Sequence, residues 1–312
     1  MQRILAIHLG ALGDLLLSFP ALFVLKKSYG ARLTLFCQSA WAEAATCLGL
    51  AEETRPIESA AFSTLFSPRP DGKLADRLSG YDQAVVFSSS AELYQNIAAR
   101  VPKAVQVPPR PPLGQPVHAA THVFSHLVRQ GLLEQTPDDP ADALPSFPAF
   151  FSKPDGPVLI HPGSGSPRKN WSLDRYAKLG AALETQGVES LFLPGPAEQG
   201  MAGALIEYGV EAKRIVPADS IGKVLELIKT ARGYAGNDSG ISHLAGLCGL
   251  PAVCIFGPSD PVRWKPVGKN VRVVRPELSC APCFETEEHN CESPPPCFPR
   301  HGDLQMLAAF LP

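Results

Sequence analysis

The stretch from Asn237 to His243 combines the residue types that a phosphate-binding turn needs. It follows an apolar segment typical of a β-strand and opens a run of small residues, Leu244 to Cys248, that predicts a helix. Asp238 or Ser239 can cap that helix, and Gly240 lets a ligand approach the backbone closely. Because the first N–H groups of a helix lack partners and its N-terminus carries partial positive charge, such a turn can bind phosphate. An ordinary strand-to-helix turn explains this stretch, taken alone, about equally well.

A second polar loop, residues 161–172, follows another strand-like segment and gathers hydroxyl and cationic side chains. Ser164 and Ser166 can donate hydrogen bonds to phosphate oxygens, and Lys169 can supply a positive charge. The alternative is a flexible polar loop that ends at Ser172, a helix cap. The number of donors favours phosphate binding. The loop is not a P-loop, because the G-x-x-x-x-G-K-[ST] spacing is absent.

Two carboxylates stand at further predicted strand-to-helix turns. Asp14 follows the first strand, and it is either a helix cap, the simpler interpretation of a single carboxylate, or a general base at the mouth of a cleft. Glu198 is either a favourable charge in the first turn of a helix or an acceptor for ribose hydroxyls, and the sequence alone favours the former. The first turn lacks the G-x-G-x-x-G fingerprint, and no acidic residue ends a clear second strand, which disfavours a nicotinamide-dependent dehydrogenase.

Predicted strands and helices alternate along the chain, which indicates an α/β protein with parallel sheets flanked by helices. A proline-rich stretch, residues 136–157, is a candidate linker. We therefore predict an N-terminal domain over residues 1–150, a C-terminal domain over residues 151–300 and a C-terminal helix over residues 301–312. The expected strands are 3–9, 32–37, 83–87, 104–107, 158–161, 190–193, 214–216, 233–235, 252–256 and 271–275. The expected helices are 14–28, 41–48, 91–100, 118–133, 172–186, 197–209, 220–230 and 239–248.

Composition limits the class of protein. With 312 residues and 45% hydrophobic residues, the chain can form two globular domains. Its net charge of −2 argues against a nucleic-acid-binding protein. No apolar run is long enough to span a bilayer, and the first nine residues do not fit a signal peptide. We expect a cytoplasmic protein, with peripheral contact with the inner face of the inner membrane as an open alternative.

Four motifs occur in order along the chain. They are Gly13-Asp14 followed by Phe19-Pro20-Ala21-Leu22, the His161-Pro162-Gly163-Ser164 loop ending in Lys169 and Trp171, the Asp238–His243 segment, and the Phe256–Pro261 segment. In this order they resemble the heptosyltransferase family of lipopolysaccharide biosynthesis, glycosyltransferase family nine. The resemblance implies a GT-B fold, in which two Rossmann-like domains with parallel sheets face an interdomain cleft. It also implies an ADP-heptose donor, held mainly by the C-terminal domain, and transfer with inversion.

The resemblance also implies roles for individual residues. Asp14 resembles the catalytic base, Lys169 with Ser164 resembles the diphosphate ligands, and Glu198 resembles the residue that holds the ribose. The family binds phosphate at the start of a helix, and the residues that resemble this helix start are Asp238, Ser239, Gly240 and His243. An inverting transfer needs a base for the proton of the acceptor hydroxyl, and fixed donors can stabilise the leaving diphosphate. We therefore expect no metal or other cofactor to be required for catalysis.

The acceptor side is less clearly marked. Arg69, Lys73 and Arg77 are spaced four apart and would form one cationic stripe on a helix, although Pro70 and Gly72 weaken its start. Such a surface could meet a lipid-linked core oligosaccharide or the anionic head groups of a membrane. A solvated charged face explains the three residues equally well.

A cysteine cluster near the end of the chain has the spacing C-x2-C-x7-C-x5-C, formed by Cys280, Cys283, Cys291 and Cys297. Its C-x2-C start is typical of a metal site, whereas its C-x5-C end is loose for a zinc ribbon. A structural zinc is one interpretation, and reduced thiols or a disulfide are the others.

We therefore predict a glycosyltransferase that moves heptose from ADP-heptose to a lipopolysaccharide inner-core acceptor, with Asp14 as general base. One alternative is a sugar-nucleotide epimerase of similar fold. Another is a non-catalytic module that binds a nucleotide sugar, or a metal at the cysteine cluster. The sequence alone does not fix the nucleotide base or the acceptor sugar.

Overall fold

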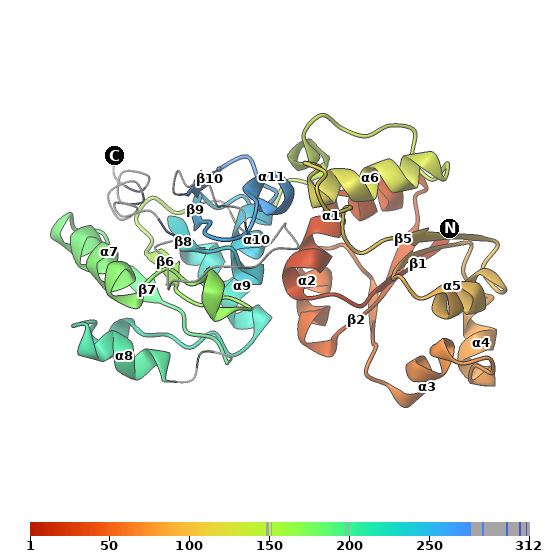
Figure 1. Ribbon diagram of the computed structural model, residues 1–312, viewed down its shortest axis with the longest axis horizontal. Helices are drawn as coiled ribbons and strands as arrows, with labels where there is room; N and C mark the ends of the chain where they lie inside the picture. The colour runs from red at the N-terminus through yellow and green to blue at the C-terminus, as the bar shows by residue number, and fades with distance from the viewer. Residues whose placement is uncertain are drawn as a thin grey trace. The chain divides into compact units, whose positions relative to one another are not determined.

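The computed structural model divides the chain into two compact units (Figure 1). Unit 1 comprises Met1–Pro111 and Ala119–Pro145, and unit 2 comprises Pro112–His118 and Ser146–Pro312. The chain therefore passes between the units three times. The structure describes residues 1–147, 150, 152–196, 198, 200–275, 283, 298, 306 and 310. Almost all of the predicted C-terminal helix, residues 301–312, lies outside the described residues.

Unit 1 is built on a five-stranded parallel sheet in the order β3-β2-β1-β4-β5. Its strands are β1 Arg3–His8, β2 Arg32–Cys37, β3 Glu53–Pro56, β4 Gln83–Phe87 and β5 Lys103–Val107. The chain builds outward from β1 to β2 and β3, then returns to place β4 on the other side of β1. The crevice at the carboxyl ends of β1 and β4 is therefore the switch point of this sheet, where ligands bind in open α/β folds.

Helices cover both faces of the unit 1 sheet (Figure 1). On one face, α1 (Leu12–Ser28) packs against α6 (Ala119–Arg129). On the other face, alternate strand residues such as Leu5 and Ile7 form a core with α3 (Ala60–Ser63), α4 (Gly72–Leu78) and α5 (Ala91–Ala98). A short α2 (Ala42–Cys47) lies beside β2 and β3. Burial on both faces explains why β1 and β4 are continuous apolar runs.

Unit 2 has a second five-stranded parallel sheet in the order β10-β9-β8-β6-β7. Its strands are β6 Val158–His161, β7 Ser190–Phe192, β8 Gly233–Asn237, β9 Ala252–Ile255 and β10 Val271–Val274. Its helices are α7 Leu173–Thr185, α8 Met201–Glu207, α9 Ile221–Thr230, α10 Gly240–Leu247 and α11 Pro261–Trp264. The switch point of this sheet lies between β6 and β8. The prediction of two α/β units with parallel sheets is confirmed.

The strand predicted at residues 214–216 is wrong. A 3-10 turn, Ala212–Arg214, occupies its start, and only one parallel bridge joins Ile215 to Phe192 on β7. Pro217 follows at once and has no N–H to continue the ladder, so the pairing stops there. In the described part of the chain, no helix has both the length and the apolar character that crossing a membrane would require.

Candidate functional site

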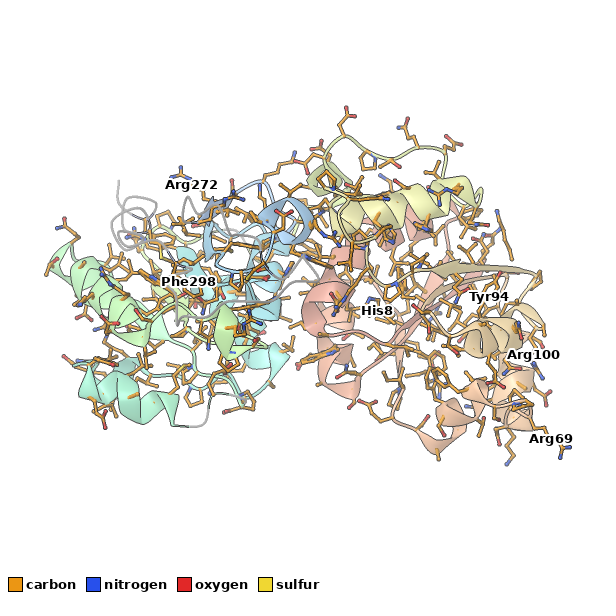
Figure 2. The ribbon with its side chains drawn as sticks, viewed as in Figure 1. His8, Arg69, Tyr94, Arg100, Arg272 and Phe298 are labelled. Carbon is orange, nitrogen blue, oxygen red and sulfur yellow. The ribbon has the colours of Figure 1, made fainter. Side chains whose placement is uncertain are left out.

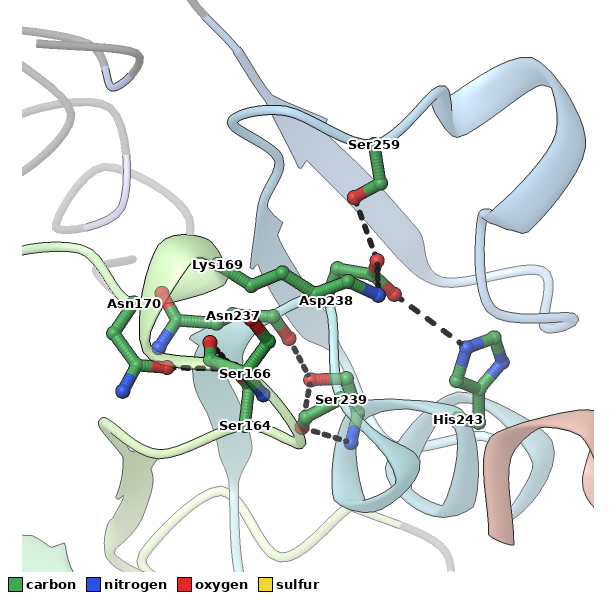
Figure 3. Close-up of polar contacts among 10 residues, drawn as sticks. Ser164, Ser166, Lys169, Asn170, Asn237, Asp238, Ser239, His243 and Ser259 are labelled. Atoms are coloured by element: carbon green, nitrogen blue, oxygen red, sulfur yellow. Dashed lines mark hydrogen bonds and ion pairs between the residues drawn. The ribbon is translucent and has the colours of Figure 1, made fainter. Parts of the chain in front are cut away.

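The loops that follow β6 and β8 meet at the switch point of unit 2 (Figure 3). The β6 loop runs over residues 162–171, and β8 ends at Asn237, directly before Asp238 and Ser239. The two strands are hydrogen-bonded neighbours in the sheet, so their carboxyl ends present both loops together. Here we use the name switch-point cluster for Ser164, Lys169, Asn237, Asp238, Ser239, His243 and Ser259.

Asn237 ties both ends of the β6 loop to β8. Its side chain is fully buried, and its Oδ1 accepts hydrogen bonds from the N–H of Trp171 at 2.9 Å and from the Tyr176 hydroxyl at 2.8 Å. Its Nδ2 donates to the carbonyl of Pro162 at 2.6 Å. Sequence reasoning missed this role, although an amide at the end of an otherwise apolar strand signals a buried hydrogen-bond network.

Ser164 serves its own loop in this structure. Its Oγ lies 2.6 Å from Oδ1 of Asn170 and 2.7 Å from the carbonyl of Ser166. The N–H of Ser166 also points to this hydroxyl, at 3.3 Å. These contacts give the loop a defined shape instead of the flexible one that the alternative interpretation assumed.

Lys169 and Asp238 form an ion pair at the centre of the switch-point cluster, with 2.6 Å between Nζ and Oδ2. The Ser259 hydroxyl donates to the same Oδ2 at 2.6 Å, and Nε2 of His243 lies 3.8 Å from Oδ1 (Figure 3). Burial alone would raise the pKa of Asp238, but the His243 ring and the Lys169 charge outweigh it and hold that pKa at about 2. The carboxylate is therefore ionised at neutral pH. Three of the predicted motifs meet at this one side chain.

The start of α10 is capped by Ser239, whose Oγ accepts a hydrogen bond from the N–H of Ser242 at 3.3 Å. Asp238, the other predicted cap, points instead to Lys169. Gly240 is the first residue of the helix. His243, one turn further, is buried, and its Nδ1 has no hydrogen-bond partner among the residues that the structure describes. The turn thus presents a helix N-terminus and a buried imidazole beside the ion pair.

Glu198 lies before α8, which begins at Met201, so its interpretation as a first-turn charge is wrong. Its Oε2 accepts a hydrogen bond from the N–H of Gly195 at 2.5 Å. A methyl group on Gly163 or Gly195 would collide with the carboxylate, so both glycines are needed for this close approach. Glu198 also acts on buried His161, where burial lowers the pKa and the Glu198 charge partly opposes that shift.

Asp14 lies in unit 1, in the first turn of α1. The cap position belongs to Ala11, which makes no side-chain bond, so the interpretation of Asp14 as a cap is wrong. Its half-buried carboxylate follows β1 at the switch point of the unit 1 sheet. A carboxylate in the first turn of a helix is stabilised by the helix N-terminus.

The predicted cationic stripe is only partly helical. Lys73 and Arg77 lie on α4, but Arg69 precedes the helix, because Asp71 is the cap and accepts the N–H of Leu74 at 2.8 Å. Arg69 extends from the periphery of unit 1 (Figure 2). All three cations are exposed. Arg69 therefore lies outside the helical stripe that was predicted for the three residues.

The predicted metal site is untested. Cys280, Cys291 and Cys297 lie outside the described residues, and Sγ of Cys283 lies 4.0 Å from Nη2 of Arg168. Across the part of the chain that the structure describes, no group of three His, Cys, Asp or Glu residues is placed to hold a metal ion.

A model of glycosyltransferase family 9 (heptosyltransferase) matches residues 118–292, more than half of the chain. The chain belongs to glycosyltransferase family 9. The matched range contains the whole switch-point cluster. The family predicted from the four motifs is therefore confirmed.

Curated relatives match over shorter segments. Lipopolysaccharide heptosyltransferase 1 of Pseudomonas aeruginosa is 28% identical over 147 residues, which is 46% of this chain and 39% of that protein. Lipopolysaccharide heptosyltransferase 3 of Escherichia coli is 30% identical over 118 residues, which is 36% of this chain and 34% of that protein. The chain thus matches less than half of the length of either relative.

Solved structures match over nearly the whole chain. A family 9 glycosyl transferase from Veillonella parvula superimposes with a TM-score of 0.70 at 17% identity, covering 91% of this chain and 90% of that one. The E. coli heptosyltransferase WaaC with ADP gives a TM-score of 0.67 at 18% identity, covering 87% and 92%. The predicted GT-B fold is confirmed.

Proposed function

We propose that this protein transfers heptose from ADP-heptose to a lipopolysaccharide inner-core acceptor, with inversion at the anomeric carbon. The observation that carries the proposal is the switch-point cluster, which sets a lysine, a buried carboxylate and a helix N-terminus together in a family 9 chain. Solved structures of this fold support the choice of donor, since one holds ADP and another holds ADP-2-deoxy-2-fluoro heptose.

The donor diphosphate would bind at Lys169 and the first N–H groups of α10. Both carry positive charge, which stabilises the negative charge that develops on the leaving diphosphate. Asp238 is itself an anion and repels phosphate, so we assign it two other tasks. It orients Lys169 through their ion pair, and it accepts hydrogen bonds from hydroxyls of the donor sugar. Glu198 would hold the ribose hydroxyls in the same way.

The transfer step would use Asp14 as the general base. Its carboxylate takes the proton of the acceptor hydroxyl while the acceptor oxygen bonds to the anomeric carbon from the face opposite the diphosphate. The bond from that carbon to the diphosphate breaks, and ADP leaves with the electron pair. Attack on the opposite face inverts the anomeric configuration. Because Lys169 and α10 supply the positive charge, the step needs no divalent metal.

The acceptor would be a phosphorylated, lipid-linked core oligosaccharide. Arg69, Lys73 and Arg77 are exposed cations on unit 1 and suit its phosphates. The same side chains would attract the anionic surface of a membrane during brief contact.

Calorimetric titration of ADP, UDP and GDP tests the donor site. We expect ADP to bind best, and Lys169→Met to weaken ADP binding by at least about tenfold, because a charge-assisted bond to diphosphate is lost. Lys178→Met is the matched control, since Lys178 is an exposed lysine on α7 that pairs with Asp174. Asp14→Asn should bind ADP normally and lose transfer. Preference for UDP, or full transfer by Asp14→Asn, contradicts the proposal.

A further inference from the structure

His8 occupies the last position of β1, directly before the turn that carries Asp14. The side chain is buried, and its ring packs against Phe87 on β4 with 5.0 Å between ring centroids. The donor site lies in unit 2, and the proposed transfer step assigns nothing to this residue. A buried imidazole beside the proposed base therefore needs its own explanation.

One nitrogen of the ring has a backbone partner within the turn. Nδ1 accepts the N–H of Gly10 at 3.2 Å, so the neutral ring must carry its proton on Nε2. The imidazole thus holds the backbone at the beginning of the turn that carries Asp14.

Packing holds the same three residues together. A Cβ on Gly10 would lie 2.8 Å from Cε1 of His8 and 3.1 Å from Cβ of Asp14. Glycine is therefore needed at position 10 if the ring and the Asp14 side chain are to pack against the backbone from both sides. Burial lowers the pKa of His8 to about 4, and the nearby Asp14 backbone partly opposes this shift. The ring is neutral at physiological pH, as its role as an acceptor requires.

We propose that His8 is a positioning residue for Asp14. As a neutral imidazole protonated at Nε2 it holds Gly10, against which the Asp14 side chain packs, so that the carboxylate keeps one orientation. The inference rests on the proposed role of Asp14 as general base. A phenylalanine could fill the space beside Phe87, but it would leave the Gly10 N–H without its acceptor. The carboxylate would then sample orientations in which it cannot reach the acceptor proton.

Kinetics of His8→Phe, His8→Asn and Asp14→Asn test the inference. We expect His8→Phe to lower kcat by about 10- to 100-fold, as small misplacements of a catalytic group do, with the acceptor KM and the ADP affinity nearly unchanged. His8→Asn should recover part of kcat, because its Oδ1 can accept the Gly10 N–H. Tyr94→Phe is the control. Tyr94 lies on α5 of the same unit, and its hydroxyl donates a 3.2 Å hydrogen bond to the Ala104 carbonyl, so removing that hydroxyl should leave kcat unchanged (Figure 2).

A second measurement does not depend on activity. Long-range ¹H–¹⁵N NMR of histidine-labelled protein should show a neutral His8 ring protonated at Nε2 at pH 7. A ring protonated at Nδ1, or a charged ring, overturns the inference even if no His8 variant folds.

The outcomes also separate the inference from the function on which it rests. If Asp14→Asn keeps full transfer, both fail. If Asp14→Asn is inactive while a folded His8→Phe keeps full kcat, the positioning role alone fails.

Discussion

The replacement Asp238→Asn tests the electrostatics at the centre of the switch-point cluster. The carboxylate is 5% exposed, and its pKa falls from 3.8 to about 2 on folding. A shift of this size corresponds to about 2 kcal/mol of folding free energy. Asparagine keeps the shape but removes the charge that Lys169 and the His243 ring stabilise. We therefore expect the variant to lose about 2 kcal/mol at pH 7, which lowers the unfolding temperature of a unit of this size by roughly 4–8 °C.

Urea unfolding of the ligand-free protein measures this loss. Asp219→Asn is the control, since its exposed pair with Lys223, at 3.8 Å, should contribute at most about 0.5 kcal/mol. The folded-state pKa of Asp238 lies below the unfolded value, so its contribution is complete above pH 3.8 and disappears as the pH falls towards 2. The difference between wild type and Asp238→Asn should shrink over that window. A variant as stable as wild type at pH 7 would refute the reasoning, because it would show that desolvation cancels the attraction.

Three further predictions concern the β6 loop, the unit 1 turn and the metal requirement. Asn237→Ala should lower the free energy of unfolding by about 3 kcal/mol and weaken ADP binding in calorimetry, because both ends of the loop lose buried hydrogen bonds. Tyr176→Phe should have a smaller effect on both quantities. An unchanged ADP affinity of Asn237→Ala would contradict this prediction. For His8, the unfolded chain takes up a proton below pH 6.5 that the folded protein binds only near pH 4, so stability should fall by up to about 3 kcal/mol across that interval. The stability of His8→Phe, measured by urea unfolding, should not show this fall. An identical pH dependence of stability in wild type and His8→Phe would contradict the prediction. Transfer should persist in EDTA, and loss of activity that Mg²⁺ restores would show that a metal is required.

Strong local patterns made much of the fold predictable. The strands at Arg32–Cys37 and Gln83–Phe87 have the predicted bounds because buried parallel strands are continuous apolar runs. The strand Glu53–Pro56 was missed because it is partly or fully exposed along its length and carries no apolar pattern. Pro217 limits the neighbouring segment to one bridge, an effect that hydrophobic patterning does not register.

The candidate site was predictable in its residue types but not in its pairings. The hydroxyls, the lysine and the helix start are visible in the sequence as polar turns after apolar strands. The partners of Asn237 lie 61 to 75 residues away, and Lys169 lies 69 residues from Asp238. Such contacts depend on which strands become neighbours at the switch point. Local patterns could therefore suggest that Asp238 caps α10, but could not show that it turns to Lys169 and leaves the cap to Ser239.

The central claim is heptosyl transfer with inversion, and product analysis tests it most directly. Purified protein would be incubated with ADP-heptose and core oligosaccharide from cells that lack heptose, and the product examined by mass spectrometry and NMR. We predict one added heptosyl unit, an anomeric configuration opposite to that of the donor, and one ADP per transfer. Conversion of ADP-heptose to an epimer without acceptor, or a product that retains the donor configuration, would contradict the account.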